Sequence, residues 1–355
     1  MIEKYLKNNF KDDSGTIREV FQAFDKNGDG YIDHKEFETL LHDVFTHAKY
    51  NGTQSSMSNN LVDSLLKVFD EDKDGKINFG EFSKLWKYWL KQILKPVTAL
   101  IIVDVQNDFI NGSLALKHCP AGQDGDCVIS PINNMLTEVP FDVVIYSIDW
   151  HPSNHISFHD NRTLRPFHLE SQECKEDVDL FDTVIFDGPP QTKQVLWPRH
   201  CVQESHGAQL HPDLKILEKG YQVYKGTNPE IDSYSAFWDN NKLSQTELCD
   251  ILVKHSVTDV YVCGLAYDIC VGYTATHSTE HGFRTTLIDN ASKGVSMDGI
   301  NQMKQSLIKK GVVIADSYQV KDMVLGTDRA LHHGIKAAAN FYLARKMYEA
   351  KLLNS

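Results

Sequence analysis

The sequence lacks any cluster of positive charge. Asp and Glu number 48 against 36 Lys and Arg, and the formal net charge at pH 7 is -12. A nucleic-acid surface needs Lys and Arg gathered on one face, where they neutralise phosphates. We therefore expect no nucleic-acid partner, whereas the acidic balance is compatible with binding of cations.

Cysteines and long apolar runs are also scarce. The seven cysteines form neither CxxC pairs nor zinc-finger spacing, which is typical of reduced thiols rather than a disulfide framework. No apolar stretch approaches the length of a membrane span, and the N-terminal MIEKYLKNNFKDD lacks the apolar core of a signal peptide. We expect a soluble protein of the cytosol, with the nucleus as an alternative, and no membrane partner. Composition leaves the oligomeric state open, so a homo-oligomer is compatible with it.

The first 95 residues contain an internal repeat. DKNGDGYIDHKE and DEDKDGKINFGE both match the calcium-loop pattern D-x-[DN]-x-[DN]-G-x5-E. Helical patterns flank each loop, and Ile32 and Ile77 are placed to pair across a short ribbon. This arrangement resembles a paired EF-hand domain. The predicted calcium ligands are Asp25, Asn27, Asp29, Tyr31, Asp33 and Glu36 in the first loop, and Asp70, Asp72, Asp74, Lys76, Asn78 and Glu81 in the second.

From residue 96 onward the pattern changes to that of an α/β domain. Apolar runs such as TALIIV, VVIYSI and VYVCGLA alternate with helical stretches, which indicates a doubly wound parallel sheet. The sequence thus predicts an all-α EF-hand domain over residues 1–95. A second domain is predicted over 96–355, closed by a long C-terminal helix that packs on the body of the protein or on a partner.

Polar residues follow two of the predicted strands. DVQNDF, beginning at Asp104, follows TALIIV, at an edge where α/β sheets place their chemistry. Cys270 falls where a helix begins after VYVCGLA, a position that lowers the pKa of a thiol. Taken alone, Asp104 and Asp108 are equally explained as helix caps, and Cys270 as a buried apolar residue.

An aspartate and two histidines form a candidate metal site. Asp149 and His151 alternate on one side of an extended segment, and WPRHCV adds His200 beside Trp197. One carboxylate and two imidazoles suit zinc, iron or manganese with open coordination positions, and the sequence does not choose among these metals. His155 and His168 are further candidates, although loop histidines of this kind are also ordinary surface residues.

The ordered motifs IIVDVQNDFINGSLA, SIDWHPSNHISF, LWPRHCV, KG, YSAF and GLAYDICV resemble the nicotinamidase/pyrazinamidase branch of the isochorismatase-like cysteine hydrolases. The resemblance implies Cys270 as nucleophile, Asp104 as general base and acid, and Lys225 as the third member of a triad. It also implies an oxyanion hole from the backbone of Ala266 and Cys270, with a cis peptide at Leu265-Ala266. Asp149, His151 and His200 match the metal ligands of the family.

The same resemblance implies nicotinamide as the substrate, hydrolysed to nicotinate and ammonia in NAD salvage. Aromatic side chains are expected to sandwich the flat pyridine ring, although aromatics at strand ends are by default ordinary core. Residues 160–195 depart from compact relatives and are expected to form a lid or a surface excursion. The expected ring contacts are Phe109, Trp197 and either Tyr234 or Phe237.

Two alternatives stay open at this point. In one, the domain acts on another small amide, such as a carbamoyl or ureido compound; in the other, it is an inactive binding module of a calcium-dependent adaptor. The calcium loops likewise fit either a sensor or a structural lobe. In a sensor, Phe45, Trp86 and Trp89 are candidates for an exposed apolar face; in a structural lobe they pack permanently against the hydrolase.

Overall fold

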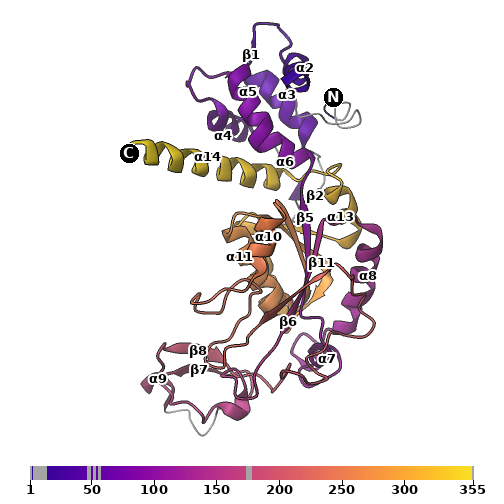
Figure 1. Cartoon of the computed structure of the whole chain (residues 1–355), viewed down its shortest axis with the longest axis vertical. Coiled ribbons are helices and arrows are strands. Elements are labelled where there is room, and N and C mark those ends of the chain that lie inside the picture. The colour runs from indigo at the N-terminus through magenta and orange to yellow at the C-terminus, as the bar shows by residue number, and fades with distance from the viewer. Residues whose placement is uncertain are drawn as a thin grey trace. The chain divides into compact units, whose positions relative to one another are not determined.

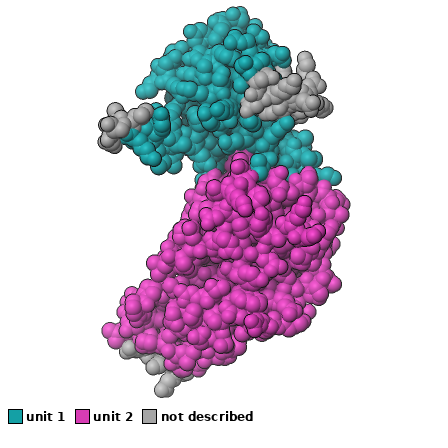
Figure 2. All heavy atoms as spheres, viewed as in Figure 1, with its two compact units in different colours: residues 1–97, 319–355 teal, residues 98–318 magenta. Residues whose placement is uncertain are grey.

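The computed structural model describes residues 2, 14–45, 49–50, 53–54, 57–172 and 178–353. The chain divides into two compact units, coloured separately in Figure 2. Unit 1 comprises residues 1–97 and 319–355, and unit 2 comprises residues 98–318. No helix among the described residues combines the length and the apolarity that a membrane crossing requires.

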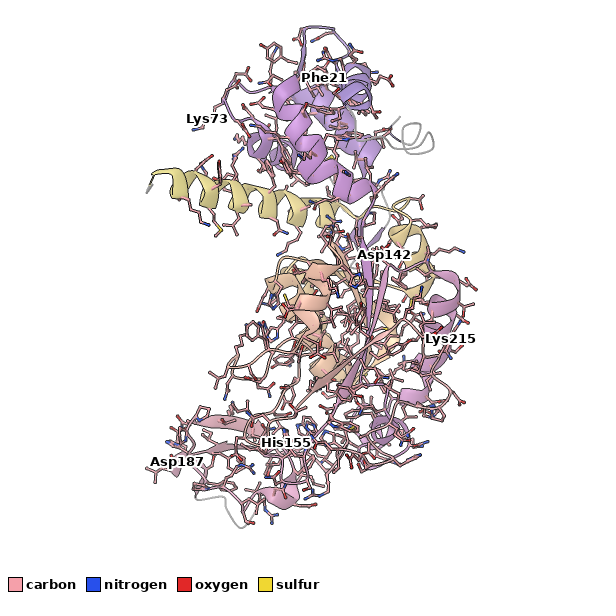
Figure 3. The ribbon with its side chains drawn as sticks, in the orientation of Figure 1. Phe21, Lys73, Asp142, His155, Asp187 and Lys215 are labelled. Carbon is pink, nitrogen blue, oxygen red and sulfur yellow. The ribbon has the colours of Figure 1, made fainter. Side chains whose placement is uncertain are left out.

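Unit 1 contains the two EF-hands as helix–loop–helix segments. The loops pair through an antiparallel ribbon in which Ile32 lies opposite Ile77, as predicted. Phe21 of the first hand, labelled in Figure 3, packs edge-on against Phe82 of the second at 5.3 Å between ring centroids. The elements are α2 (Ser14–Phe24), β1 (Tyr31–Ile32), α3 (His34–Val44), β2 (Lys49–Tyr50), β3 (Thr53–Gln54), α4 (Asn59–Phe69), β4 (Ile77–Asn78), α5 (Phe79–Leu85), the π-helical turn η1 (Trp86–Leu90) and α6 (Lys91–Leu94).

The long C-terminal helix α14 (Leu331–Leu353) also belongs to unit 1 (Figures 1 and 2). Leu331, Ala337 and Ala338 are buried in the same apolar cluster as the EF-hand helices. We predicted that this helix would close the second domain, and the structure differs from that prediction. The helix belongs to unit 1 because one of its faces completes the apolar core of the EF-hands.

Unit 2 is built on a six-stranded parallel sheet in the order β12-β11-β10-β5-β6-β9. Helices α10 and α11 lie on one side of the sheet and α8 on the other, as expected for right-handed crossovers that run in opposite directions from β5 (Figure 1). The strands are β5 (Thr98–Val103), β6 (Val143–Asp149), β9 (Tyr221–Lys225), β10 (Asp259–Leu265), β11 (Arg284–Lys293) and β12 (Val313–Ala315). The helical elements are α7 (Asn107–Ile110), η2 (Leu116–His118), η3 (Gly125–Val128), α8 (Ile129–Glu138), η4 (His159–Asn161), α9 (Leu169–Gln172), α10 (Leu248–Lys254), η5 (Tyr267–Val271), α11 (Gly272–Glu280) and α12 (Met297–Lys309); α13 (Ser317–Val324) leads out of the unit.

The segment 160–195 folds into a small substructure, apart from residues 173–177, which lie outside the described part. Strands β7 (Thr183–Phe186) and β8 (Thr192–Val195) form an antiparallel hairpin. Asp187, labelled in Figure 3, follows directly on β7. A separate apolar cluster supports the hairpin and consists of Ile156, Phe167, Val178, Val184, Phe186 and Leu196. The expected excursion is therefore an ordered hairpin that ends just before Trp197.

Candidate active site and metal centre

Four neighbouring strands deliver the candidate catalytic and metal-binding residues to one edge of the sheet. Asp104 follows β5, Asp149 ends β6 and Lys225 ends β9. Cys270 lies in η5, directly after β10. In a parallel sheet, a crevice forms at the carboxyl ends of the strands where the strand order reverses direction. Here the order reverses at β5, which lies between β10 and β6.

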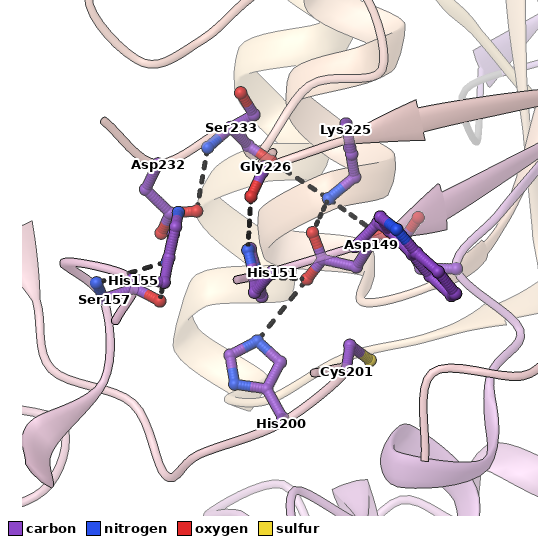
Figure 4. A network of polar contacts seen from close by, with 12 residues as sticks. Asp149, His151, His155, Ser157, His200, Cys201, Lys225, Gly226, Asp232 and Ser233 are labelled. Atoms are coloured by element: carbon purple, nitrogen blue, oxygen red, sulfur yellow. Dashed lines mark hydrogen bonds and ion pairs between the residues drawn. The ribbon is translucent and has the colours of Figure 1, made fainter. Parts of the chain in front are cut away.

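The amine of Lys225 is the centre of the arrangement. Its Nζ lies 2.9 Å from Asp104 Oδ2, 2.9 Å from Asp149 Oδ1 and 3.4 Å from Cys270 Sγ, and it also donates to the Ser233 carbonyl at 2.9 Å. Burial alone would lower the pKa of Lys225, but the carboxylates of Asp104 and Asp149 outweigh it and hold that pKa well above its ordinary value. Lys225 is thus a buried cation that contacts both the predicted triad and the predicted metal ligand Asp149, and Figure 4 shows the contact with Asp149.

Asp104 is fully buried and has a left-handed backbone, with φ of 50°. The hydroxyl of Ser147 donates to Asp104 Oδ1 at 2.7 Å, while Oδ2 faces Lys225. Burial raises the pKa of Asp104, and Lys225 opposes that rise. A carboxylate with a raised pKa is a stronger base, which suits a group that takes a proton from a thiol.

The Cys270 thiol corrects one expectation from the sequence. We predicted a lowered pKa from its position at a helix start, but burial raises the pKa of Cys270 well above its ordinary value; Lys225 acts in the opposite direction, and Asp104 adds to the rise. Cys270 lies inside the π-helical turn η5, and only 7% of its surface is exposed. The resting sulfur therefore carries its proton, so a neighbouring base is needed to form the thiolate.

Asp149, His151 and His200 are all buried, and one donor atom from each lies within 4.8 Å of the others. Asp149 Oδ2 is 2.9 Å from His151 Nε2 and 3.4 Å from His200 Nε2. The Nδ1 atoms of the two histidines instead face backbone carbonyls, those of Gly226 at 2.9 Å and Pro198 at 2.7 Å. Both rings are thereby oriented with Nε2 toward the carboxylate, an arrangement that fits a divalent transition metal with three protein ligands.

His155 and His168 occupy different surroundings. The His155 ring stacks on His151 at 4.0 Å between centroids, and His155 groups with His151 and Asp232 rather than with Asp149 and His200. Its Nδ1 contacts Ser157 Oγ at 2.7 Å (Figure 4). Burial holds the pKa of His155 well below its ordinary value, so the ring is neutral. His168 lies beside β7, where its backbone N–H donates to Ile185, and it joins neither histidine group among the described residues.

A hollow of about 400 Å³, including its open mouth, lies over the sulfur. The three aromatic residues predicted to contact the substrate ring, Phe109, Trp197 and Tyr234, line it together with Asp149, His200, Ala266 and Cys270. Its remaining apolar walls were not predicted and are provided by Leu114, Leu116, Ile269 and Val295. Phe237, the alternative to Tyr234, instead stacks on His281 at 5.0 Å between centroids.

The peptide bond between Leu265 and Ala266 is cis, as the family resemblance implied. Ala266 and Cys270, the predicted oxyanion-hole residues, both line the hollow. Ala266, directly before η5, and Cys270, within η5, therefore both border the space where a substrate carbonyl would lie.

Three residues that support the site were not predicted to do so from the sequence. Gln106 holds the backbone of Asp149 through two hydrogen bonds of 2.8 Å, one in each direction. Asp108 accepts the backbone N–H of Cys201 at 2.7 Å and so fixes the segment that carries His200. Ser147 holds Asp104, as described above. Only the DVQNDF motif itself could have pointed to the first two, because their partners lie far along the chain.

In the EF-hands, the glutamate predicted as the ligand at position twelve makes the same backbone contact in both loops. Glu36 Oε2 accepts the backbone N–H of Asp33 at 3.0 Å, and Glu81 Oε2 accepts that of Asn78 at 2.9 Å. Asp70, Asp72 and Asp74 bring one oxygen each within 4.8 Å of the others. Gly30 and Gly75 both have φ of 84°, which allows the sharp turn at position six. This set of hard oxygen donors fits calcium.

Comparison with known protein families gives one match in each of the two units. The family model described as Isochorismatase domain matches residues 98–319, and the one described as EF-hand domain pair matches residues 16–87. The first match covers more than half of the chain. The chain therefore belongs to the isochorismatase family and carries an EF-hand pair ahead of that domain.

Individual proteins similar to this chain include nicotinamidases from bacteria and yeast. The chain is 37% identical over 205 residues to a nicotinamidase of Escherichia coli, which covers 57% of this chain and 85% of the relative. A solved nicotinamidase/pyrazinamidase structure from Acinetobacter baumannii matches with a TM-score of 0.54 and 36% identity, over 63% of this chain and 98% of that one. The yeast nicotinamidase bound to the inhibitor nicotinaldehyde matches with a TM-score of 0.52 and 30% identity, over 62% and 99%.

Proposed function

We propose that unit 2 is a nicotinamidase, an amidohydrolase that converts nicotinamide to nicotinate and ammonia through a thioester on Cys270. The observation that carries the proposal is the position of Lys225, whose Nζ lies 2.9 Å from Asp104 and 3.4 Å from the Cys270 sulfur, beneath a hollow with aromatic walls. The similarity to nicotinamidases that span the same domain supports the choice of substrate. Nicotinate made in this way would enter NAD salvage.

In the first half-reaction, Asp104 takes the proton of the Cys270 thiol, and the sulfur attacks the carboxamide carbon of the substrate. Lys225 stabilises the forming thiolate by its positive charge. Backbone N–H groups of Ala266 and Cys270 donate to the carbonyl oxygen as it becomes an oxyanion, a contribution of about 3 kcal/mol per donor. The C–N bond then breaks, Asp104 returns the proton to the leaving nitrogen, and ammonia departs.

In the second half-reaction, water attacks the thioester carbon and gives a proton to Asp104. The C–S bond breaks, the proton returns to the sulfur, and nicotinate leaves with the thiol restored. The neutral, protonated resting state of Cys270 fits this cycle, since the sulfur begins and ends it as a thiol.

The metal centre is assigned a positioning role. Asp149, His151 and His200 would hold zinc, iron or manganese, and such a cation supplies an open Lewis-acid position that can take the pyridine nitrogen. Phe109, Trp197 and Tyr234 would hold the faces of the ring. The protein thereby directs the carboxamide to the sulfur, and good orientation of this kind accounts for a large share of a rate enhancement.

The test is ammonia release by the purified chain from nicotinamide, pyrazinamide and a ureido compound. We expect release from the first two, and a decrease of at least about 10³-fold in Cys270→Ala. Cys127→Ala, which changes an exposed cysteine, serves as the matched control and should keep wild-type activity. Wild-type turnover by Cys270→Ala would exclude the thioester route, and faster release from the ureido compound would replace the substrate assignment.

A further inference from the structure

The apolar groove of the EF-hand pair is filled by the chain's own helix α14. Phe45, Phe69 and Trp89 come from three different segments of the hands, and their rings form one cluster, with Trp89 at 5.8 Å from Phe45 and 4.9 Å from Phe69 between centroids. All three are at least 97% buried. Phe341 of α14 stacks on Phe69 at 5.4 Å. Phe45 and Trp89, two of the three residues that the sequence offered as a sensor face, are thus covered within unit 1, and the third, Trp86, is also fully buried.

Polar contacts fix the position of the helix in that groove. The indole Nε1 of Trp89 donates to the carbonyl of Gly334 at 2.8 Å, in a buried hydrogen bond. Arg345 donates to the carbonyl of Val68, near the end of α4, also at 2.8 Å. Terminal carbonyls of a helix have no partner within it, so Arg345 satisfies a group that the hand itself leaves open.

One face of α14 makes these contacts. Leu331, Gly334, Ala338, Phe341 and Arg345 follow one another at alternating spacings of three and four residues, the pattern by which helices enter grooves. At Gly334 the approach is so close that an added Cβ would lie 2.2 Å from a ring carbon of Phe45. By contrast, Leu343 is 61% exposed and makes no part of this face.

The same helix reaches the second calcium loop. Arg345 lies 3.9 Å from Glu71, the second residue of that loop. The backbone N–H of Glu71 in turn donates at 2.7 Å to Glu81, the predicted ligand at position twelve. Phe69, which stacks on Phe341, immediately precedes the first predicted ligand, Asp70. Residues at the start of the second calcium loop, Phe69 and Glu71, therefore also contact α14.

We propose that α14 is a built-in target helix of the EF-hand pair, and that calcium binding and α14 docking stabilise each other. Calcium opens the groove of sensor hands, and an open groove binds an amphipathic helix. Because such coupling is reciprocal, α14 raises the calcium affinity of the hands by the factor by which calcium favours docking. The inference rests on calcium binding by the two loops and is independent of the reaction proposed for unit 2.

Hydrogen exchange of the full chain, with calcium and with a calcium-selective chelator, tests the linkage directly. We expect the amides of residues 331–345 to exchange about tenfold faster or more after calcium removal. Peptides from β10 in unit 2 provide the internal control and should not change. Equal exchange of α14 in both conditions would show that the helix is a permanent part of the core and would overturn the proposal.

Calcium titration of two variants tests the reciprocal effect. Phe341→Ala removes a ring that packs on Phe69 and should weaken calcium binding about fivefold or more. Leu343→Ala, on the exposed face of the same helix, should bind calcium as the wild type does. Equal affinity in the two variants, or no calcium binding by the wild-type chain, contradicts the inference; loss of ammonia release alone does not bear on it.

Discussion

Gln106 uses its whole side-chain amide to hold the strand end that carries the first metal ligand. Its Nε2 donates to the carbonyls of Asp149 and Ala208, both at 2.8 Å, and its Oε1 accepts the Asp149 N–H at 2.8 Å. The side chain is completely buried. Each buried polar group left without a partner costs about 1–3 kcal/mol, so this single amide fixes the position of the ligand backbone.

Gln106→Ala should therefore weaken retention of the active-site metal by about 10- to 100-fold. Metal content measured against graded chelator concentrations reports the effect without reliance on activity. Gln222→Ala removes an exposed glutamine of β9 and is the matched control. If Gln106→Ala keeps its metal as firmly as the control, the amide has no role in shaping the site.

For single residues, the sequence predicted which side chains converge in the active site, but not which hydrogen bonds fix their positions. Asp104 and Asp149 each stand where an apolar strand ends, so their convergence followed from the parallel sheet. The supports Gln106 and Asp108 act on backbone groups 43 and 93 residues away, a separation that no local pattern reports. The raised pKa of Cys270 also depends on burial, which a turn motif does not reveal.

Strands β10 and β11 are joined at their starts by a buried ion pair. Arg284 Nε donates to Asp259 Oδ1 at 2.9 Å, and Nη2 contacts the second carboxylate oxygen. Both side chains are at least 94% buried. The pair lies at the opposite end of β10 from Cys270, and so it holds the strand that positions the nucleophile.

Asp259→Ala should destabilise the sheet by about 3–5 kcal/mol, because it leaves the Arg284 cation buried without its partner. Native-state hydrogen exchange of the β10 and β11 amides measures this free energy locally. Lys242→Ala breaks an ion pair whose side chains are 52% and 40% exposed and should change the same quantity by no more than about 1 kcal/mol. Similar values for the two variants would mean that the buried pair contributes no special stability.

Among the elements, the central strands were predictable and the hairpin was not. TALIIV and VVIYSI are continuous apolar runs, as strands covered on both faces require, and they form β5 and β6. β8 has the sequence TKQV, which carries no comparable signal, and its pairing with β7 depends on a separate apolar cluster. That cluster includes Ile156 and Leu196, which lie 40 residues apart.

The whole molecule has two units, each with its own predicted metals, and this makes its unfolding separable. Calcium at about 100 times its dissociation constant should add about 2.7 kcal/mol per site to the stability of unit 1. A divalent transition metal should instead stabilise unit 2, through Asp149, His151 and His200. We expect calorimetry of the full chain to show two transitions, each raised by one of the metals.

Glu81→Gln, which weakens the second loop, should reduce the calcium-dependent shift and leave the other transition in place. A single transition that both metals raise together would show instead that the two units unfold as one.

At the scale of the whole molecule, the main feature that the sequence did not predict is that α14 belongs to unit 1. Its sequence indicated a helix, but the spacing of apolar residues shows only that a helix has an apolar face and not which surface covers that face. The deciding contacts join Trp89 to Gly334 and Val68 to Arg345, across 245 and 277 residues.

The discontinuity of unit 1 also sets an order of events on the ribosome. A nascent chain grows from its N-terminus, and domains generally fold as they emerge. Both EF-hands are synthesised before unit 2, whereas α14 follows it. During translation the aromatic residues of the hands that α14 covers in the folded protein therefore lack that cover until the entire hydrolase has been made.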